Sequence, residues 1–331
     1  MANPNVQSSK VRGPGDPAAS SRRGVLADNV IEELWFGDED PKRSQLEASR
    51  SMAAALGIAT GLRPFPVVLQ KALALLRDPD APRRKVVELI EQDPALTSRL
   101  LRVANSALYG GARTCHSVMD AVMRLGNRTV SDLITGIAVL GMFADVGGYG
   151  ARVRDHSAAV AAIARVLAIE WRHSGTDHVF LAGLMHDIGK LLMVQAGTPR
   201  YEQIPKAVLA QADRVHVEER HLVGYDHATL GAHVLSHWQL PVEVSRVVAW
   251  HHRPGRAFEE GGEVALDVAL VRLSDHIELA AASAHKPDAA LWEQIGKEEA
   301  TQYAGFDVAA VEAMWPKLLQ ARTEALSALT R

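Results

Sequence analysis

The chain has 331 residues, and its 36 lysines and arginines against 39 acidic residues give a net charge of −3. That balance offers no global attraction for nucleic acid or an anionic membrane, and 47% hydrophobic residues exclude a wholly disordered chain. Cys115 is the only cysteine, which excludes a disulfide framework and a cysteine-rich zinc site within one chain. No apolar run reaches the roughly 18–20 residues of a membrane span. We therefore expect a cytoplasmic protein that binds neither membrane nor nucleic acid.

The first part of the sequence divides into a tail, an extension and a helical region. Residues 1–25 are rich in Gly, Pro, Ser and Ala, a composition typical of a disordered tail. Residues 26–61 have a helical pattern broken by proline and acidic residues, so we expect a helical extension there. Strong helical periodicity begins at Val67, and Asp93 followed by Pro94 is typical of a helix start.

The later elements also have the periodicity of helices. Ser117 is expected to cap a helix that ends at Gly126, and residues 130–143 are apolar on most sides, which predicts a buried helix. Gly147, Gly148 and Gly150 mark a boundary between two helical layers. Further helices are predicted at about residues 152–172, 177–195, 201–214, 226–238, 242–252 and 264–283, with one or two more after Pro287. No stretch alternates like a β-strand, so the sequence predicts an all-α protein of two packed helical subdomains.

Seven polar residues lie on the apolar faces of these predicted helices. Their spacing from core-type side chains on the same helix directs each of them inward. A single inward histidine is more often a hydrogen-bonded core residue than a ligand. Seven buried polar groups on five helices favour a shared site, because each is costly to bury without a partner. The seven are His156, His186, Asp187, His227, His251, His252 and Asp275.

Imidazole and carboxylate groups together suit a divalent first-row transition metal. On a continuous helix, the side chains of His186 and Asp187 would diverge by about 100°, so they could serve two ions, or Asp187 could bridge a pair. Two such ions could activate a water for attack on phosphorus, which makes Asp187 a candidate catalytic residue. Lys190 is the other candidate: it could bind an anionic substrate oxygen, or it could be a surface lysine paired with an acid.

Short motifs follow one another from about residue 60 to residue 285. The first half contains Leu62-Arg-Pro-Phe-Pro66, Asp93-Pro-Ala-Leu96, Leu101-Arg-Val-Ala-Asn-Ser106 and Ala121-Val-Met-Arg-Leu-Gly126. The second half contains Phe180-Leu-Ala-Gly-Leu-Met-His-Asp-Ile-Gly-Lys190, Tyr225-Asp-His227, Trp238-Gln-Leu-Pro241 and His251-His252. In these motifs the chain resembles the HDOD family, the HD-related output domain of bacterial signalling proteins, within the HD superfamily of metal-dependent phosphohydrolases.

The resemblance implies a domain organisation and a metal. It implies an HDOD domain over residues 62–285, made of an N-terminal helical subdomain (62–146) and an HD-like subdomain (151–285). Residues 286–331 would then form a C-terminal helical extension. The seven polar residues match the full ligand order of HD-GYP-like members, which implies one or two ions of iron or manganese.

The resemblance also implies a regulatory function. We expect a signalling output module that acts through protein partners or through a nucleotide or phosphate ligand. The alternative is a metal-dependent phosphohydrolase of the HD type, which the intact ligand set and Lys190 favour. The HD-GYP cyclic-di-GMP phosphodiesterases continue with a Gly-Tyr-Pro loop, whereas this chain reads Arg253-Pro-Gly-Arg256, which argues against hydrolysis of cyclic-di-GMP. Arg253 and Arg256 could grip phosphate in place of that loop, or they could form a solvated turn.

Overall fold

The computed structural model describes most of the chain after residue 64. The described residues are 57, 65–78, 80–110, 113–144, 147–171, 178–196, 204, 212–283 and 287–330. Within them every regular element is a helix and no strand is present, which confirms the predicted all-α class. None of the helices in these ranges is long and apolar enough to span a bilayer. The tail expected over residues 1–25, and all but Gly57 of the extension expected over 26–61, lie outside the described residues.

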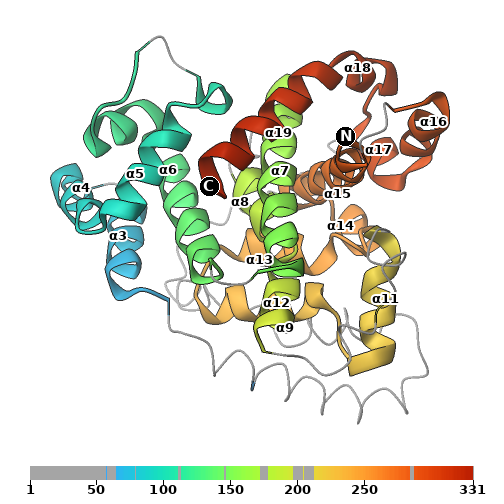
Figure 1. Ribbon diagram of the computed structural model, residues 1–331, viewed down its shortest axis with the longest axis horizontal. Helices are drawn as coiled ribbons and strands as arrows, with labels where there is room; N and C mark the ends of the chain where they lie inside the picture. Colours follow the sequence, from blue (N-terminus) through green and yellow to red (C-terminus); the bar gives the residue numbers. More distant parts are fainter. Residues whose placement is uncertain are drawn as a thin grey trace, which may run out of the picture.

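The first helices gather on the left of Figure 1. They are α3 (Val67–Arg77), α4 (Arg83–Glu91), α5 (Pro94–Ala104), the 3₁₀ helix η2 (Ala107–Tyr109) and α6 (Val118–Met142). Two of their starts follow the predicted caps. The Asp93 side chain accepts a hydrogen bond from the first turn of α5, and Ser117 forms a capping box with Asp120 at the start of α6. Gly126, where the sequence predicts a helix end, is instead a kink within α6 with φ of 81°.

The second group of helices, called the second layer below, contains α7, which runs through the middle of Figure 1. They are α7 (Tyr149–Glu170), α8 (Val179–Met185), α9 (Ile188–Gln195), α11 (Ala212–Val223), α12 (His227–His237), α13 (Val242–Trp250), α14 (Gly255–Glu260) and α15 (Gly262–Ala282). Residues 157–164 of α7 are buried on all sides of the helix, because α8, α9, α15 and the C-terminal α19 (Trp315–Leu329) all pack against it. α7 is therefore the central element of this layer.

The C-terminal residues add four helices, where the sequence predicts one or two. Before α19 come α16 (Ala289–Lys297), α17 (Glu299–Ala304) and α18 (Val308–Ala313). α17 packs on α15, and α19 packs back along α7 and α5. In α19, Glu324 accepts a hydrogen bond from the backbone of Leu108 in η2 at 3.2 Å. The C-terminal helices thus contact both of the preceding groups of helices.

Two further differences from the sequence analysis concern the second layer. The single helix predicted over 177–195 is divided into α8 and α9, because Asp187 leaves helical geometry with φ of −101° and ψ of 12°. Of the helix predicted over 201–214, only Ile204 and the last three residues are described, whereas α11 continues through residues 215–223, where none is predicted. The buried face of α11 includes the polar side chains His216 and Glu219, so it lacks the apolar stripe that periodicity detects.

Glycines let the histidine-bearing helices approach closely. A Cβ on Gly189 of α9 would lie 2.6 Å from the carbonyl carbon of His227 in α12, far inside ordinary contact. A Cβ on Gly183 of α8 would lie 2.9 Å from the Cα of Ala161 in α7. Because only glycine fits at both positions, α8 and α9 bring their junction directly against α7 and α12.

Candidate metal centre

Five segments of the second layer bring the seven inward polar residues together. Neighbouring imidazole rings in this cluster have centroids 4.0–5.4 Å apart. The members are His156 in α7, His186 and Asp187 at the α8–α9 junction, His227 at the start of α12, His251 and His252 directly after α13, and Asp275 in α15. Asp275 joins the cluster through His156, whose Nε2 atom lies 3.0 Å from its Oδ1 atom.

The break between α8 and α9 directs His186 and Asp187 to the same point. Asp187 is the residue that precedes α9, so its side chain no longer diverges from that of His186 as it would on a continuous helix. The Nε2 atom of His186 lies 3.5 Å from the Oδ2 atom of Asp187. On the other side of the carboxylate, the Nε2 atom of His227 lies 3.2 Å from Oδ1.

Asp187 consequently belongs to two compact sets of donor atoms. In each set the nitrogen and oxygen atoms all lie within 4.8 Å of one another. The inner set consists of Asp187, His227, His251 and His252, all of them buried. The outer set consists of His156, His186 and Asp187. Of the two alternatives that the sequence leaves open, this geometry matches a carboxylate shared between two positions.

The same kind of local hydrogen bond orients two of the histidines. The Nδ1 atom of His186 lies 2.7 Å from the carbonyl oxygen of Gly183, and that of His251 lies 2.7 Å from the carbonyl oxygen of Val248. Each Nδ1–H donates to the carbonyl three residues earlier, so the lone pair is on Nε2, which faces Asp187. Burial lowers the pKa of both rings, and most strongly that of His251. Both are therefore neutral imidazoles, the form that binds a metal.

His227 is held by Glu219, which the sequence analysis did not identify as a site residue. Its Nδ1 atom lies 2.6 Å from Oε2 of Glu219, and its backbone N–H donates to the same oxygen at 2.8 Å. Burial would lower the pKa of His227, but the Glu219 carboxylate raises it to about 9. A carboxylate behind a ligand histidine fixes the ring and increases its basicity. The available signal was only a glutamate eight residues before His227.

His216 is a second residue that the sequence analysis missed. Its ring stacks on that of His252 with centroids 4.5 Å apart, and it is 7% exposed. Burial lowers its pKa to about 4. His216 and Glu219 are three residues apart on α11, a spacing that places both on one helix face. This helix therefore forms a polar wall behind the inner set.

Lys190 lies inside the cluster rather than on the surface. It is 8% exposed, and its Nζ atom donates to Oδ2 of Asp187 at 2.7 Å. Burial would lower the pKa of Lys190, but the Asp187 carboxylate raises it above its usual value. Conversely, burial would raise the pKa of Asp187, but Lys190 and the neighbouring histidines hold it well below its usual range. Both groups are charged at neutral pH, and Lys190 adds positive charge beside the outer set.

The outer set is more exposed to solvent than the inner set. The His156 side chain is 17% exposed, and its Nε2 atom lies 3.0 Å from Oδ1 of Asp275. Burial would lower the pKa of His156, but Asp275 raises it. In the inner set, His227 and His251 are at most 1% exposed, and His252 is 9% exposed.

The donor atoms fit a divalent transition metal. Two buried imidazole nitrogens of the cluster have no hydrogen-bond partner among the described residues: Nε2 of His186 and Nε2 of His251. Unsatisfied buried polar atoms are costly, and a cation bound beside Asp187 would satisfy both nitrogens. Imidazole nitrogens with a carboxylate suit iron, manganese or zinc.

The two arginines after His252 have other contacts. The Nε atom of Arg256 donates to Oε1 of Glu260 at 3.1 Å, and its guanidinium lies 6.0 Å from the ring centroid of Trp250. The backbone N–H of Arg253 donates to the carbonyl oxygen of Trp250 at 2.9 Å and closes the turn after α13. Their role as phosphate ligands stays a prediction.

Comparisons with known proteins place the chain in a family. The model of the HDOD domain matches residues 62–254. An uncharacterized protein from Treponema pallidum (strain Nichols) is 25% identical over 244 residues. The match covers 71% of this chain and 46% of that protein, so the chain spans about half the length of its curated relative.

Solved structures share the fold. A Shewanella amazonensis SB2B protein named as a candidate phosphohydrolase is 25% identical, with a TM-score of 0.66, over 84% of this chain and 98% of that chain. An HDOD domain protein of unknown function from Geobacter sulfurreducens is 23% identical, with a TM-score of 0.62, over 84% and 99% of the two chains. Because the family match covers more than half of the sequence, this chain belongs to the HDOD family.

Proposed function

We propose that this protein is a metal-containing signalling module in which the His/Asp cluster binds one or two divalent ions, iron or manganese. The observation that carries the proposal is the position of Asp187, shared by the inner and outer sets and surrounded by unpartnered donor atoms. Membership in a family of output domains supports action through protein partners or a nucleotide.

The closed inner set supports a structural ion. It offers four buried protein ligands, of which His252 is the most exposed at 9%, and sites with a complete set of protein ligands are typically structural. An ion held there would join the α8–α9 junction, the start of α12 and the turn after α13. Binding of the ion would then stabilise the fold of the second layer, which suits a module whose output is a shape rather than a reaction.

The outer set supports a second candidate function, a phosphohydrolase. It has three protein ligands, it borders solvent, and Lys190 lies beside it, an arrangement that leaves a coordination position open. A divalent ion there would lower the pKa of a bound water and offset the charge of phosphate oxygens. Within the chain, Lys190 would hold an anionic oxygen, and Asp187 would keep that ammonium in place. The structural relative named as a candidate phosphohydrolase agrees with this alternative.

Turnover also requires that the substrate be held in line with the attacking water. The chain lacks the Gly-Tyr-Pro loop after His252, and Arg256 is engaged by Glu260. We therefore favour the signalling module over the enzyme.

Metal analysis combined with a hydrolysis assay tests the proposal. Wild-type protein, purified without chelator or a nickel column, is compared with Asp187→Asn and with the control His116→Ala, which removes an exposed histidine outside the cluster. We expect bound iron or manganese in wild type and control, its loss in Asp187→Asn, and no turnover of cyclic-di-GMP or generic phosphodiesters. Turnover that disappears in Asp187→Asn would establish the enzyme instead, and metal-free wild type would overturn the metal centre.

A further inference from the structure

The turn that carries His251 and His252 is held by an arginine from outside both ligand sets. Arg272 lies in α15, and its Nη1 atom donates to the backbone carbonyl oxygen of His251 at 3.0 Å. This carbonyl belongs to the end of α13, where helix carbonyls have no partner within the helix. A guanidinium at this position satisfies the carbonyl and complements the negative end of the helix.

The other side of the Arg272 guanidinium faces Glu298, which precedes α17 in the C-terminal helices. Its Nη2 atom lies 3.6 Å from Oε2 of Glu298, and Nδ1 of His276, one turn along α15, lies 3.7 Å from Oε1. The side chains of Arg272, His276 and Glu298 are only 12%, 13% and 18% exposed, so water screens these charges weakly. A series of contacts therefore joins the C-terminal helices to the backbone of a predicted metal ligand.

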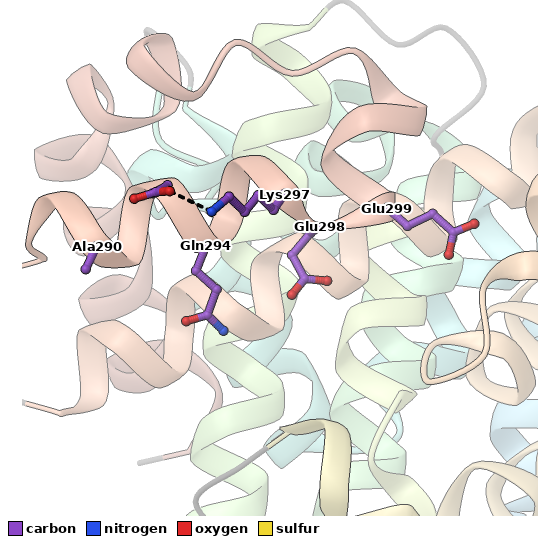
Figure 2. A pocket seen from close by; sticks show the side chains of 6 residues that line it. Ala290, Gln294, Lys297, Glu298 and Glu299 are labelled. Carbon is purple, nitrogen blue, oxygen red and sulfur yellow. Dashed lines mark hydrogen bonds and ion pairs between the residues drawn. The ribbon is translucent and has the colours of Figure 1, made fainter.

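The nearby cation Lys297 is paired with another residue and does not compete with Arg272 for the Glu298 carboxylate. Glu298 lines a surface cavity between α16 and α17 with Gln294, Lys297 and Glu299 (Figure 2). The nearby cation Lys297 donates to Glu293 at 2.6 Å, the ion pair marked by the dashed line in Figure 2. Glu298 instead forms ion pairs with Arg272 and His276.

We propose that Arg272 is a positioning residue for the inner ligand set, and that Glu298 of the C-terminal helices holds Arg272 in place. The inference rests on the metal centre proposed above and adds a second point: residues beyond the HDOD match, which ends at residue 254, set the geometry of His251. A forked guanidinium is needed because one Nη atom must reach the carbonyl while the other faces Glu298, which a lysine cannot do.

Cobalt titration of the full chain tests this inference, since Co²⁺ binds such ligands and its visible spectrum reports their geometry. After metal removal, wild type is compared with Arg272→Met, Arg272→Lys, Glu298→Gln and the double variant Arg272→Met/Glu298→Gln. Outer-sphere partners of metal ligands typically contribute about 10–100-fold in affinity. We expect about tenfold weaker binding in Arg272→Met, a smaller loss in Glu298→Gln, and no further loss in the double variant.

An ion in each ligand set gives the titration two binding steps. Which step is weakened, together with the Co²⁺ spectrum, distinguishes a positioning role from a general loss of stability. The weakened step should be the one that His251→Ala abolishes, with an altered Co²⁺ spectrum, while the step that His156→Ala abolishes stays within about twofold. Glu170→Gln is the control, because it breaks the ion pair between α7 and Lys317 of α19 without touching the cluster. Circular dichroism verifies that each variant is folded.

Three results would overturn the inference. The first is wild-type metal affinity in both Arg272→Met and Arg272→Lys. The second is equal weakening of both binding steps. The third is a fold-loss of affinity in the double variant that equals the product of the losses in the two single variants. Wild-type protein that binds no cobalt would overturn the metal centre and this inference together, whereas normal wild-type binding with unaffected variants would overturn this inference alone.

Discussion

Replacing Gly189 with alanine should separate α9 from α12 and so disturb both stability and the metal centre. The new Cβ would lie 2.6 Å from the carbonyl carbon of His227, whereas ordinary contact begins at 3.4 Å, so the helices must part by at least the difference of 0.8 Å. Backbone cannot relieve the clash by a rotamer change, so we take the upper part of the about 1–3 kcal/mol typical of overpacking. Alanine returns up to about 1 kcal/mol through helix propensity. The expected loss is about 2 kcal/mol of unfolding free energy.

Urea unfolding of the metal-free protein measures this loss, and metal content measures the displacement of His227 from Asp187. Gly141→Ala is the matched control: it also lies in a helix, but its Cβ would meet only the tip of Arg99 at an ordinary 3.7 Å. That variant should be as stable as wild type or slightly more stable. A Gly189→Ala protein with wild-type stability and metal content would refute the close approach of α9 and α12.

Three further variants test contacts around the cluster. Asp226→Ala removes the N-cap of α12, which accepts a hydrogen bond from Thr229 N at 2.8 Å, together with a part-buried ion pair with Arg220, and should cost about 2 kcal/mol in urea unfolding; a loss below about 0.5 kcal/mol would contradict this. Burial would lower the pKa of His178, but Asp132 at 3.1 Å raises it. Stabilisation by this pair is therefore complete below about pH 6.5 and is lost as pH rises through the raised pKa, so Asp132→Asn should be more destabilising at about pH 6 than at about pH 9. Equal losses at both values would exclude the ion pair. Glu219→Gln should weaken metal binding by about 10–100-fold, as measured by titration with Mn²⁺, and unchanged affinity would remove its assigned role.

Local signals in the sequence predicted the parts of the fold that depend on neighbouring residues. The caps at Asp93 and Ser117 form as expected, because each side chain reaches a backbone N–H only three residues away. The inward direction of His156 and Asp275 follows from their spacing relative to apolar residues on one helix, so their convergence was also predictable.

The features that the sequence did not predict depend on contacts between distant segments. Residues 181–190 are all buried, so periodicity gives no sign of the break at Asp187, which accompanies the close approach of Gly189 to α12. Glu219 could not be assigned a role, because its partner His227 lies beyond the end of α11 and the helix has no apolar stripe. Arg272 and Glu298 meet only after α15 and α17 pack together.

Anomalous X-ray scattering from crystals of the manganese- or iron-loaded protein tests the central claim most directly. We expect a peak bounded by Asp187, His227, His251 and His252, and, where a second ion binds, a peak bounded by Asp187, His156 and His186. Both peaks should lie beside the Asp187 carboxylate. Loaded crystals with no peak at Asp187, or with a peak held by other residues, would contradict it.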